Sequence, residues 1–261
     1  MNQKQKKILV NGCSHTRAHV PDDPTNKISW PNLLAHNTGH GVINIAEDGK
    51  ANFQIVEEAI RFVINRSSTI DHVVIQLTDW TRLNFFRKQA SGTWMPRDFL
   101  SQKSGVDVYV KIPAADNKDL HVKRLTGTPE QSIVEIGDRT LIHNIITCGT
   151  MVNSLSRLCR DKGLGLTIIN YYELGDCRGD NVWADIPDED FLIINRVNGL
   201  YNHLCWLYDT PDTMHFEKSA HFYISGLVED HVDRRQSIRV SDQNYDEIHN
   251  IQTPIFDYGD M

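Results

Sequence analysis

The stretch ILVNGCSHT, residues 8–16, determines the fold that we expect for this chain. It opens with a short apolar run behind a lysine-rich lead-in, which is typical of a buried strand. Gly12 permits a sharp turn directly after the strand, and Ser14 lies just past that turn. Ligands of open α/β sheets bind at the carboxyl ends of the strands, so Ser14 lies where chemistry is expected. A serine there is a candidate nucleophile if a histidine reaches it.

The composition is that of a soluble globular protein. The chain has 261 residues, of which 40% are hydrophobic and 23% are charged, enough to form a sizeable core. Its formal net charge of -7 argues against a general nucleic-acid binder. No apolar run approaches the roughly 18 residues of a membrane span, and the polar N-terminus does not look like a secretion signal. Five cysteines without regular spacing favour reduced thiols. We therefore expect a cytoplasmic protein that binds neither nucleic acid nor a membrane.

Strands and helices are expected to alternate in the first part of the chain. Apolar runs predict strands, and segments with helical periodicity separate them. The expected strands are 8–11, 42–46 and 72–77, and the expected helices are 29–35 and 51–65. Such alternation is the signature of a doubly wound parallel sheet.

The later part of the chain is expected to complete this sheet after a large insertion. Residues 84–140 are polar and contain short alternating runs, which predict one or two small hairpins. Further expected elements are a helix over 141–162, a fourth strand over 166–171, a helix over 191–201, a fifth strand over 203–207 and a last helix over 217–231. We expect a single α/β domain over 1–231, followed by a polar tail over 232–261 that is loosely attached or packs on a partner.

Asp212 and His215 suggest the base that Ser14 needs. The two residues are three positions apart, so the carboxylate can accept a hydrogen bond from one ring nitrogen while the other nitrogen faces a serine. In that arrangement the aspartate fixes the tautomer and stabilises the imidazolium that forms. Ser14, His215 and Asp212 would then make a catalytic triad.

Four short blocks, in order along the chain, resemble those of the SGNH (GDSL-type) hydrolases. They are Gly12-Cys13-Ser14-His15-Thr16, the isolated glycine in Asn44-Ile45-Ala46-Glu47-Asp48-Gly49, Gln76-Leu77-Thr78-Asp79, and Asp212-x-x-His215 followed by Ala220-His221. The first block and the stretch from Asn44 to Asn52 look most like SGNH-like proteins of tailed bacteriophages.

The resemblance implies a flavodoxin-like three-layer α/β/α sandwich with a central parallel sheet of about five strands. It also implies hydrolysis of an ester through an acyl-serine, without a metal or other cofactor. Ser14 would be the nucleophile, His215 the general base and then acid, and Asp212 the residue that orients His215. The backbone N–H groups of Ser14 and Gly49 would donate to the oxyanion.

The third block departs from the family pattern. Thr78 stands where the family has an asparagine that donates to the oxyanion, and Gln76 stands where the family has a glycine. Loss of one oxyanion donor costs roughly 10²–10³ in rate. Trp80 and Arg82 follow directly and are expected to line the pocket. Arg82 would bind an anionic group of the substrate or replace the missing donor.

Other interpretations of these residues remain open. In the first, none of these residues is catalytic: Ser14 is a simple turn serine, Asp212 is a helix cap and His215 is a surface histidine. Asp212, His215 and His221 would otherwise be metal ligands, since aspartate and histidine form such sites. Cys13 would be an alternative nucleophile.

Two functions follow from these observations. The first is a serine esterase or deacetylase that acts on a small acyl ester, including one carried by a carbohydrate. The second is a catalytically silent SGNH-like module with a binding or assembly role, for example in a virus particle, which would place it in the virion or the host cytoplasm. The altered third block, the insertion and the polar tail favour the second, and either function is compatible with an oligomer.

Overall fold

The computed structural model describes most of the sheet and its covering helices. The described residues are 7–17, 27–78, 85–88, 94–97, 107–111, 119–125, 133–171, 174, 182–192, 199–208 and 215–234. None of the helices within these ranges is both long and apolar enough to span a membrane.

Four parallel strands form the central sheet. They are β1 (Lys7–Asn11), β2 (Gly41–Asn44), β3 (His72–Leu77) and β9 (Gly165–Asn170). Their order is β2-β1-β3-β9, and every neighbouring pair is parallel. This is the flavodoxin-like order for the first four strands. The expected doubly wound α/β fold is therefore confirmed, with each strand at or near its predicted position.

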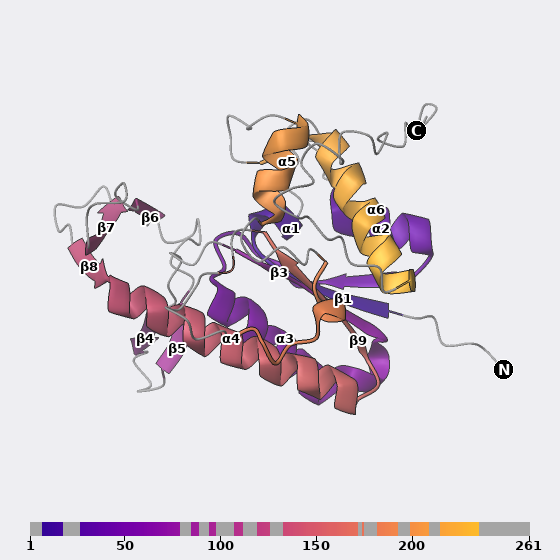
Figure 1. Cartoon of the computed structure of the whole chain (residues 1–261), viewed down its shortest axis with the longest axis horizontal. Helices are drawn as coiled ribbons and strands as arrows, with labels where there is room; N and C mark the ends of the chain where they lie inside the picture. Colours follow the sequence, from indigo (N-terminus) through magenta and orange to yellow (C-terminus); the bar gives the residue numbers. More distant parts are fainter. Residues whose placement is uncertain are drawn as a thin grey trace.

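Helices cover both faces of this sheet and make three layers (Figure 1). The helices α3 (Asn52–Arg66) and α4 (Asp138–Asp161) lie on one face. On the other face are α2 (Trp30–Thr38), α5 (Leu200–Tyr208) and α6 (Lys218–Arg234). Short helices occur at α1 (Ser14–Arg17), η1 (Ser67–Thr69) and η3 (Asp188–Asp190).

The alternation of side chains along the strands divides the interior into two cores. Leu9, Ile75 and Ile168 face α3 and α4, where they pack with residues such as Ile55 and Leu155. The intervening residues of the same strands face α2, α5 and α6; they include Ile8, Val10, Val74 and Ile169. Because both faces are covered, the strands are apolar along nearly their whole length.

The expected fifth strand at 203–207 is wrong, because these residues lie in α5. Leu200 and Leu204 are four residues apart and both face the core, which is a helical spacing that a short apolar run conceals. The position beside β9 is instead taken by Phe191, which makes a single parallel bridge to Ile168. Phe191 has an extended backbone, so the helix expected over 191–201 does not begin there.

The insertion contains two small antiparallel units, as the alternating runs predicted. The strands β4 (Phe85–Lys88) and β5 (Trp94–Arg97) form a hairpin. The strands β6 (Asp107–Lys111), β7 (Asp119–Leu125) and β8 (Ile133–Gly137) form a three-stranded sheet. The final helix α6 ends at Arg234, and the expected polar tail beyond it lies outside the described residues.

Candidate active site

The carboxyl ends of the four strands bring candidate residues to one edge of the sheet. Ser14 follows β1, Gly49 follows β2, Thr78 follows β3 and Tyr171 follows β9. Parallel strands end on the same side, so these segments, which are far apart in sequence, lie along one edge. This is the edge at which the sequence predicted the site.

Ser14 opens the short helix α1 directly after the turn at Gly12. The carbonyl of Cys13 accepts the N–H groups of Thr16 and Arg17, both at 3.0 Å, which closes the turn. An added Cβ at Gly12 would lie 2.2 Å from Thr16 Oγ1, so only glycine fits this approach. Ser14 is 8% exposed, whereas the Cys13 side chain is fully buried. Of the two candidate nucleophiles, Ser14 is the more accessible.

His215 is brought to this edge through His15, the neighbour of Ser14. The ring centroids of His15 and His215 are 4.7 Å apart. His15 also stacks on Tyr171 at 4.3 Å, and its Nδ1 lies 3.1 Å from the Tyr171 hydroxyl. His15 and Tyr171 are both buried. Two aromatic contacts therefore hold His15 between the carboxyl end of β9 and the candidate base.

Ser14 and His215 share no hydrogen bond among the residues that the structure describes. Catalytic hydrogen bonds are often long before substrate binds and tighten in the complex. Asp212, Trp80 and Arg82 lie outside the described residues. The contact between His15 and His215 is thus the observed link between the two halves of the expected triad, and the triad itself stays a prediction.

Thr78 is held by the side chain of Asn52, the first residue of α3. Asn52 Oδ1 accepts the Thr78 N–H at 2.6 Å, and Asn52 Nδ2 donates to the Thr78 carbonyl at 2.8 Å. Both residues are buried. The Oγ1 of Thr78 is buried and makes no hydrogen bond to any described residue. The backbone of Thr78 is therefore fixed by Asn52.

Gly49 lies in the connection between β2 and α3 with φ of 75°. This left-handed conformation favours glycine, since a Cβ would strain the turn. The preceding residues are tied to the Ser14 segment: Ile45 N–H donates to the Val10 carbonyl at 2.9 Å, and Glu47 N–H donates to the Gly12 carbonyl at 3.3 Å. The loop that carries Gly49 thus runs alongside the turn that carries Ser14.

An aromatic cluster extends from the candidate base. The Tyr201 ring lies 5.4 Å from that of Phe216 and 5.7 Å from that of Tyr171. Burial, followed by the neighbouring Cys205 thiol, raises the pKa of Tyr201 to about 12. This tyrosine therefore stays neutral at physiological pH and contributes packing and a hydroxyl.

The alternative metal site gains no support from the described residues. Among them, no group of three or more His, Cys, Asp and Glu side chains is arranged to hold a metal ion. His221 lies in α6 and accepts the N–H of Trp30 at 3.2 Å through its Nδ1. His221 therefore connects α6 to the start of α2.

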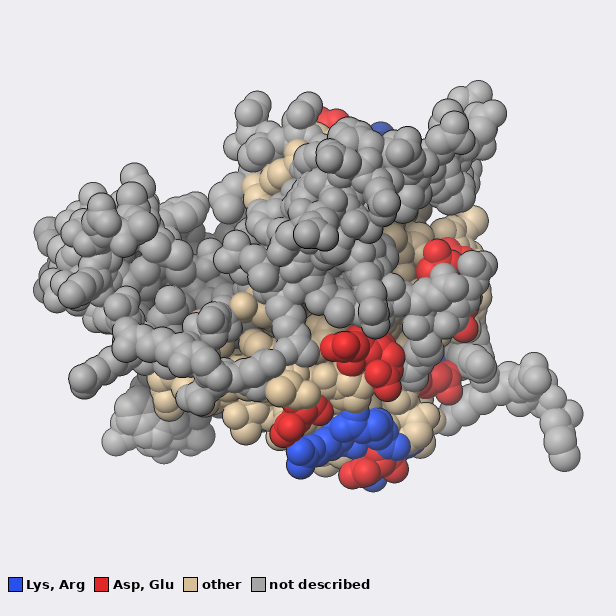
Figure 2. Space-filling view, viewed as in Figure 1, with Lys and Arg blue, Asp and Glu red and all other residues tan. Residues whose placement is uncertain are grey.

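Charged side chains of both signs are mixed on the face shown in Figure 2, where Lys and Arg lie beside Asp and Glu. Independently of that view, a pairing of opposite charges joins Arg160 to Asp190 at 3.8 Å, and Arg160 also donates to Ser156 at 3.1 Å. Ser156 in turn donates to Asp190 at 2.5 Å. Asp190, which belongs to the acidic stretch before Phe191, is therefore engaged with α4.

The sequence did not point to four residues of this edge. They are His15, Lys50, Asn52 and Tyr171. Their only sequence signal is that they lie in or beside the segments that follow the strands. Their contacts join segments that are distant in sequence, and local patterns do not encode such contacts.

Comparison with known proteins gives structural likenesses only. No protein-family model matches the sequence, and no curated protein matches it. The structure is similar to that of TesA, with a TM-score of 0.43 and 12% identity over 88% of this chain and 100% of TesA. It is also similar to the psychrotrophic esterase EstA from Pseudoalteromonas sp., with a TM-score of 0.41 and 11% identity over 88% of this chain and 98% of that chain.

A third similar structure is a proposed lipolytic protein of the G-D-S-L family from Desulfitobacterium hafniense DCB-2. Its TM-score is 0.32, with 12% identity over 69% of this chain and 65% of that chain. At these identities the likeness is one of fold.

Proposed function

We propose that this chain is a serine hydrolase of SGNH type that cleaves a small acyl ester, with Ser14 as nucleophile and His215 as base. The observation that carries the proposal is the ring contact of His15 with His215. Because His15 directly follows Ser14, this contact brings the candidate base to the turn that carries the candidate nucleophile. Both lie at the sheet edge where ligands of such folds bind.

The reaction proceeds in two steps. Ser14 Oγ attacks the ester carbonyl carbon while His215 takes its proton, and the same proton then passes to the departing alcohol. Water attacks the acyl-serine, His215 takes a proton from that water, and the proton returns to Ser14 as the acid leaves. Asp212 is assigned the task of orienting His215.

Three groups support the oxyanion in this proposal. The backbone N–H groups of Ser14 and Gly49 would donate from adjacent turns, and the Thr78 hydroxyl would donate from the end of β3. Two observations support this role for Thr78. Its Oγ1 makes no hydrogen bond to any described residue, and its backbone is held by Asn52. A threonine hydroxyl would thus replace the family's asparagine amide, and a Thr78→Val variant tests it by a loss of kcat of about 10²-fold.

The finer assignment is a deacetylase that acts on a small acetyl ester, including one on a carbohydrate. The partly buried ring of Tyr201 lies in the cluster beside the candidate base, 5.4 Å from that of Phe216. Aromatic side chains offer flat apolar area together with a polar tip. Trp80 and Arg82 are proposed to complete the pocket wall.

The test is hydrolysis of a short-chain aryl acetate by the purified chain, with Ser14→Ala and His215→Ala beside it. Matched controls are Ser154→Ala, an exposed serine on α4, and His36→Ala, an exposed histidine on α2. We expect activity in the parent chain and both controls, and its loss in both site variants. Covalent labelling of the parent, but not of Ser14→Ala, by a fluorophosphonate identifies the nucleophile independently.

The opposite result favours the silent module. That alternative rests on the altered third block, in which Thr78 stands where the family has an asparagine and Gln76 where it has a glycine. A parent chain that neither hydrolyses aryl acetates nor reacts with the fluorophosphonate would refute the hydrolase and favour a binding or assembly role.

A further inference from the structure

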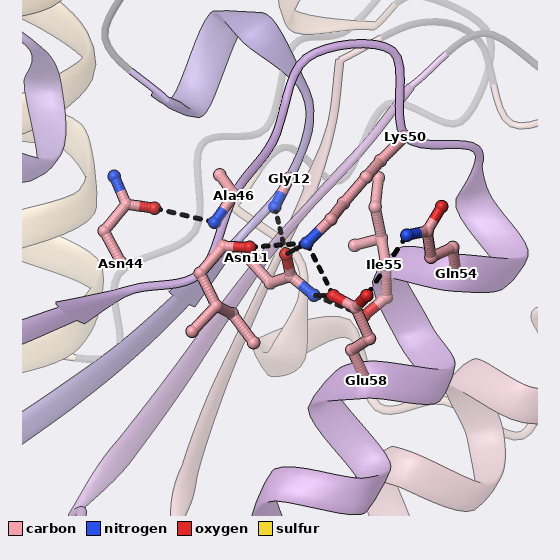
Figure 3. A network of polar contacts seen from close by, with 9 residues as sticks. Asn11, Gly12, Asn44, Ala46, Lys50, Gln54, Ile55 and Glu58 are labelled. Carbon is pink, nitrogen blue, oxygen red and sulfur yellow. Dashed lines mark hydrogen bonds and ion pairs between the residues drawn. The ribbon is translucent and has the colours of Figure 1, made fainter. Parts of the chain in front are cut away.

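Lys50 is buried, although lysine is among the residues least often buried. Figure 3 shows its side chain pointing toward Asn11 and Glu58. Lys50 is 1% exposed. Its Nζ donates to the carbonyl of Ile45 at 2.5 Å, to Glu58 Oε2 at 2.5 Å and to Asn11 Oδ1 at 3.3 Å. These three acceptors come from the connection after β2, from α3 and from the end of β1. One ammonium group therefore joins three segments of the fold.

The charge of Lys50 is balanced by Glu58. The side chain of Glu58 is 32% exposed, while that of Lys50 is 2% exposed. Glu58 is held in place from its other oxygen, since Gln54 Nε2 donates to Oε1 at 3.1 Å. A buried ammonium requires a counter-charge and further acceptors, and here it has both. The network thus fixes the position of Lys50.

Asn11 carries the effect of Lys50 to the turn of Ser14. Its Oδ1 accepts Lys50 Nζ and the N–H of Gly12, the latter at 3.0 Å. Its Nδ2 donates to the Ile55 carbonyl at 2.8 Å and to Glu58 Oε2 at 3.4 Å. The side-chain amide of Asn11 has all its hydrogen-bonding positions filled. The direction in which the chain leaves β1 towards Ser14 is set by this amide.

The same lysine adjoins Gly49, so its backbone belongs to the second turn of the site. Its N–H donates to the Glu47 carbonyl at 3.5 Å, across the residues that include Gly49. Its side chain returns to the Ile45 carbonyl at the start of the same loop. Lys50 therefore connects the end of the Gly49 turn to its start, through its backbone N–H and through its side chain.

We propose that Lys50 is a positioning residue: it locks the turn that bears Ser14 and the turn that bears Gly49 in one fixed relation. The two backbone N–H groups assigned to the oxyanion then converge without reorganisation during the reaction. This inference rests on the proposed function. Its structural part, the coupling of the two turns by one ammonium group, is measurable without any activity.

The kinetic test compares Lys50→Met with Arg61→Met. Arg61 lies in α3, the helix that carries Glu58, and forms an ion pair with Glu57. Arg61→Met therefore removes a cation from α3 without changing the contacts of Lys50. We expect Lys50→Met to lower kcat by about 10²-fold with KM nearly unchanged, because a displacement of about 1 Å costs that much. Arg61→Met should retain the parent values. Glu58→Gln keeps an acceptor for Lys50 but removes its counter-charge, so it should lower kcat as well.

Amide hydrogen exchange separates this inference from the hydrolase proposal. In Lys50→Met we expect faster exchange in both turns, residues 12–17 and 45–50, and parent-like exchange in β9 and α6. Arg61→Met should exchange like the parent throughout. If Lys50→Met does not fold, Glu58→Gln is measured in the same way.

The outcomes are distinct. Parent-like exchange in both turns of a folded variant, or a rise confined to one turn, would overturn the inference. An equal loss of kcat in Arg61→Met would overturn it as well. If the parent chain is inactive but both turns exchange faster together, the hydrolase proposal fails and the coupling of the turns by Lys50 is upheld.

Discussion

His15 and His215 face each other with ring centroids 4.7 Å apart and planes inclined by 34°, although they come from opposite ends of the chain. His15 stacks on Tyr171 as well, at 4.3 Å and 29°. The chain of rings therefore runs from the end of β9, past the neighbour of Ser14, to the segment that precedes α6. Any substitution that allows His15 to move is therefore expected to displace both Ser14 and His215.

Tyr171→Phe tests the contribution of the Tyr171 hydroxyl to stability separately from that of its ring. The variant loses the hydrogen bond to His15 Nδ1 but keeps the stacked ring. We expect the free energy of unfolding to fall by about 1 kcal/mol. Tyr171→Ala, which removes the ring from a site that is 1% exposed, should cost about 3–5 kcal/mol. Urea unfolding measures both, and equal losses would show that ring packing is unimportant here.

Gly12→Ala tests the close approach under the Ser14 turn. The new Cβ would lie 2.2 Å from Thr16 Oγ1 and 3.1 Å from Gln76 Cβ, and Thr16 is held there by its hydrogen bond to Gln76. We expect a loss of about 1–3 kcal/mol of stability through overpacking. Gly226→Ala in α6 is the matched control, since its Cβ would meet nothing within 4 Å. That variant should gain about 0.5–1 kcal/mol, and a Gly12→Ala chain as stable as the parent would contradict the argument.

Asn52→Ala releases the backbone of Thr78. It leaves the buried N–H and carbonyl of Thr78 without their acceptor and donor, and each orphaned group costs about 1–3 kcal/mol. We therefore expect a clear loss of stability and, because Thr78 is no longer fixed, a lower kcat on aryl acetates. Asn65→Ala removes an exposed side-chain bond to the Arg61 carbonyl and should stay within about 0.5 kcal/mol of the parent. Similar denaturation midpoints for the two variants would argue against the clamp.

His203 should make the fold sensitive to acid. Burial lowers the pKa of His203 below its ordinary value of 6.5. As the pH falls through 6.5, the unfolded chain takes up a proton that the folded chain does not, so stability is full above that pH and declines below it. His203→Gln, which can still bond the Tyr223 hydroxyl, should lose this component. Unfolding at pH 7.5 and pH 5.5 should show the parent losing more stability than the variant, whereas parallel losses would exclude His203 as the source.

The sheet was predictable because its signal is local. The run from His72 to Leu77 is nearly all apolar and bounded by polar residues, and it forms β3 over those same residues. The turn after β1 was also predictable from a local signal, because glycine at position 12 permits a sharp turn. The structure agrees, since a Cβ at Gly12 would lie 2.2 Å from Thr16 Oγ1. The fifth strand was wrong because a five-residue apolar run has no resolvable period, and the i,i+4 pairing of Leu200 and Leu204 made it a helix.

The candidate site was predictable only in part. The position of Ser14 follows from the strand and the turn. The network of Lys50 does not, because a lysine in a loop is expected in solvent and only three converging acceptors make its burial favourable. The meeting of His15 with His215 likewise depends on how α6 packs over the sheet.

The bridge at Phe191 has a consequence for how this molecule behaves among its copies. An open edge strand presents unpaired backbone groups that can recruit a strand from another chain. Here Phe191 bridges Ile168, and the Leu192 N–H donates to the Ile168 carbonyl at 2.9 Å, so the middle of the β9 edge is already occupied. The Tyr201 N–H donates to the Tyr171 carbonyl at 2.7 Å, just past the end of β9. A few backbone bonds thereby occupy the β9 edge, so this side of the sheet does not need a full fifth strand to block pairing with another chain.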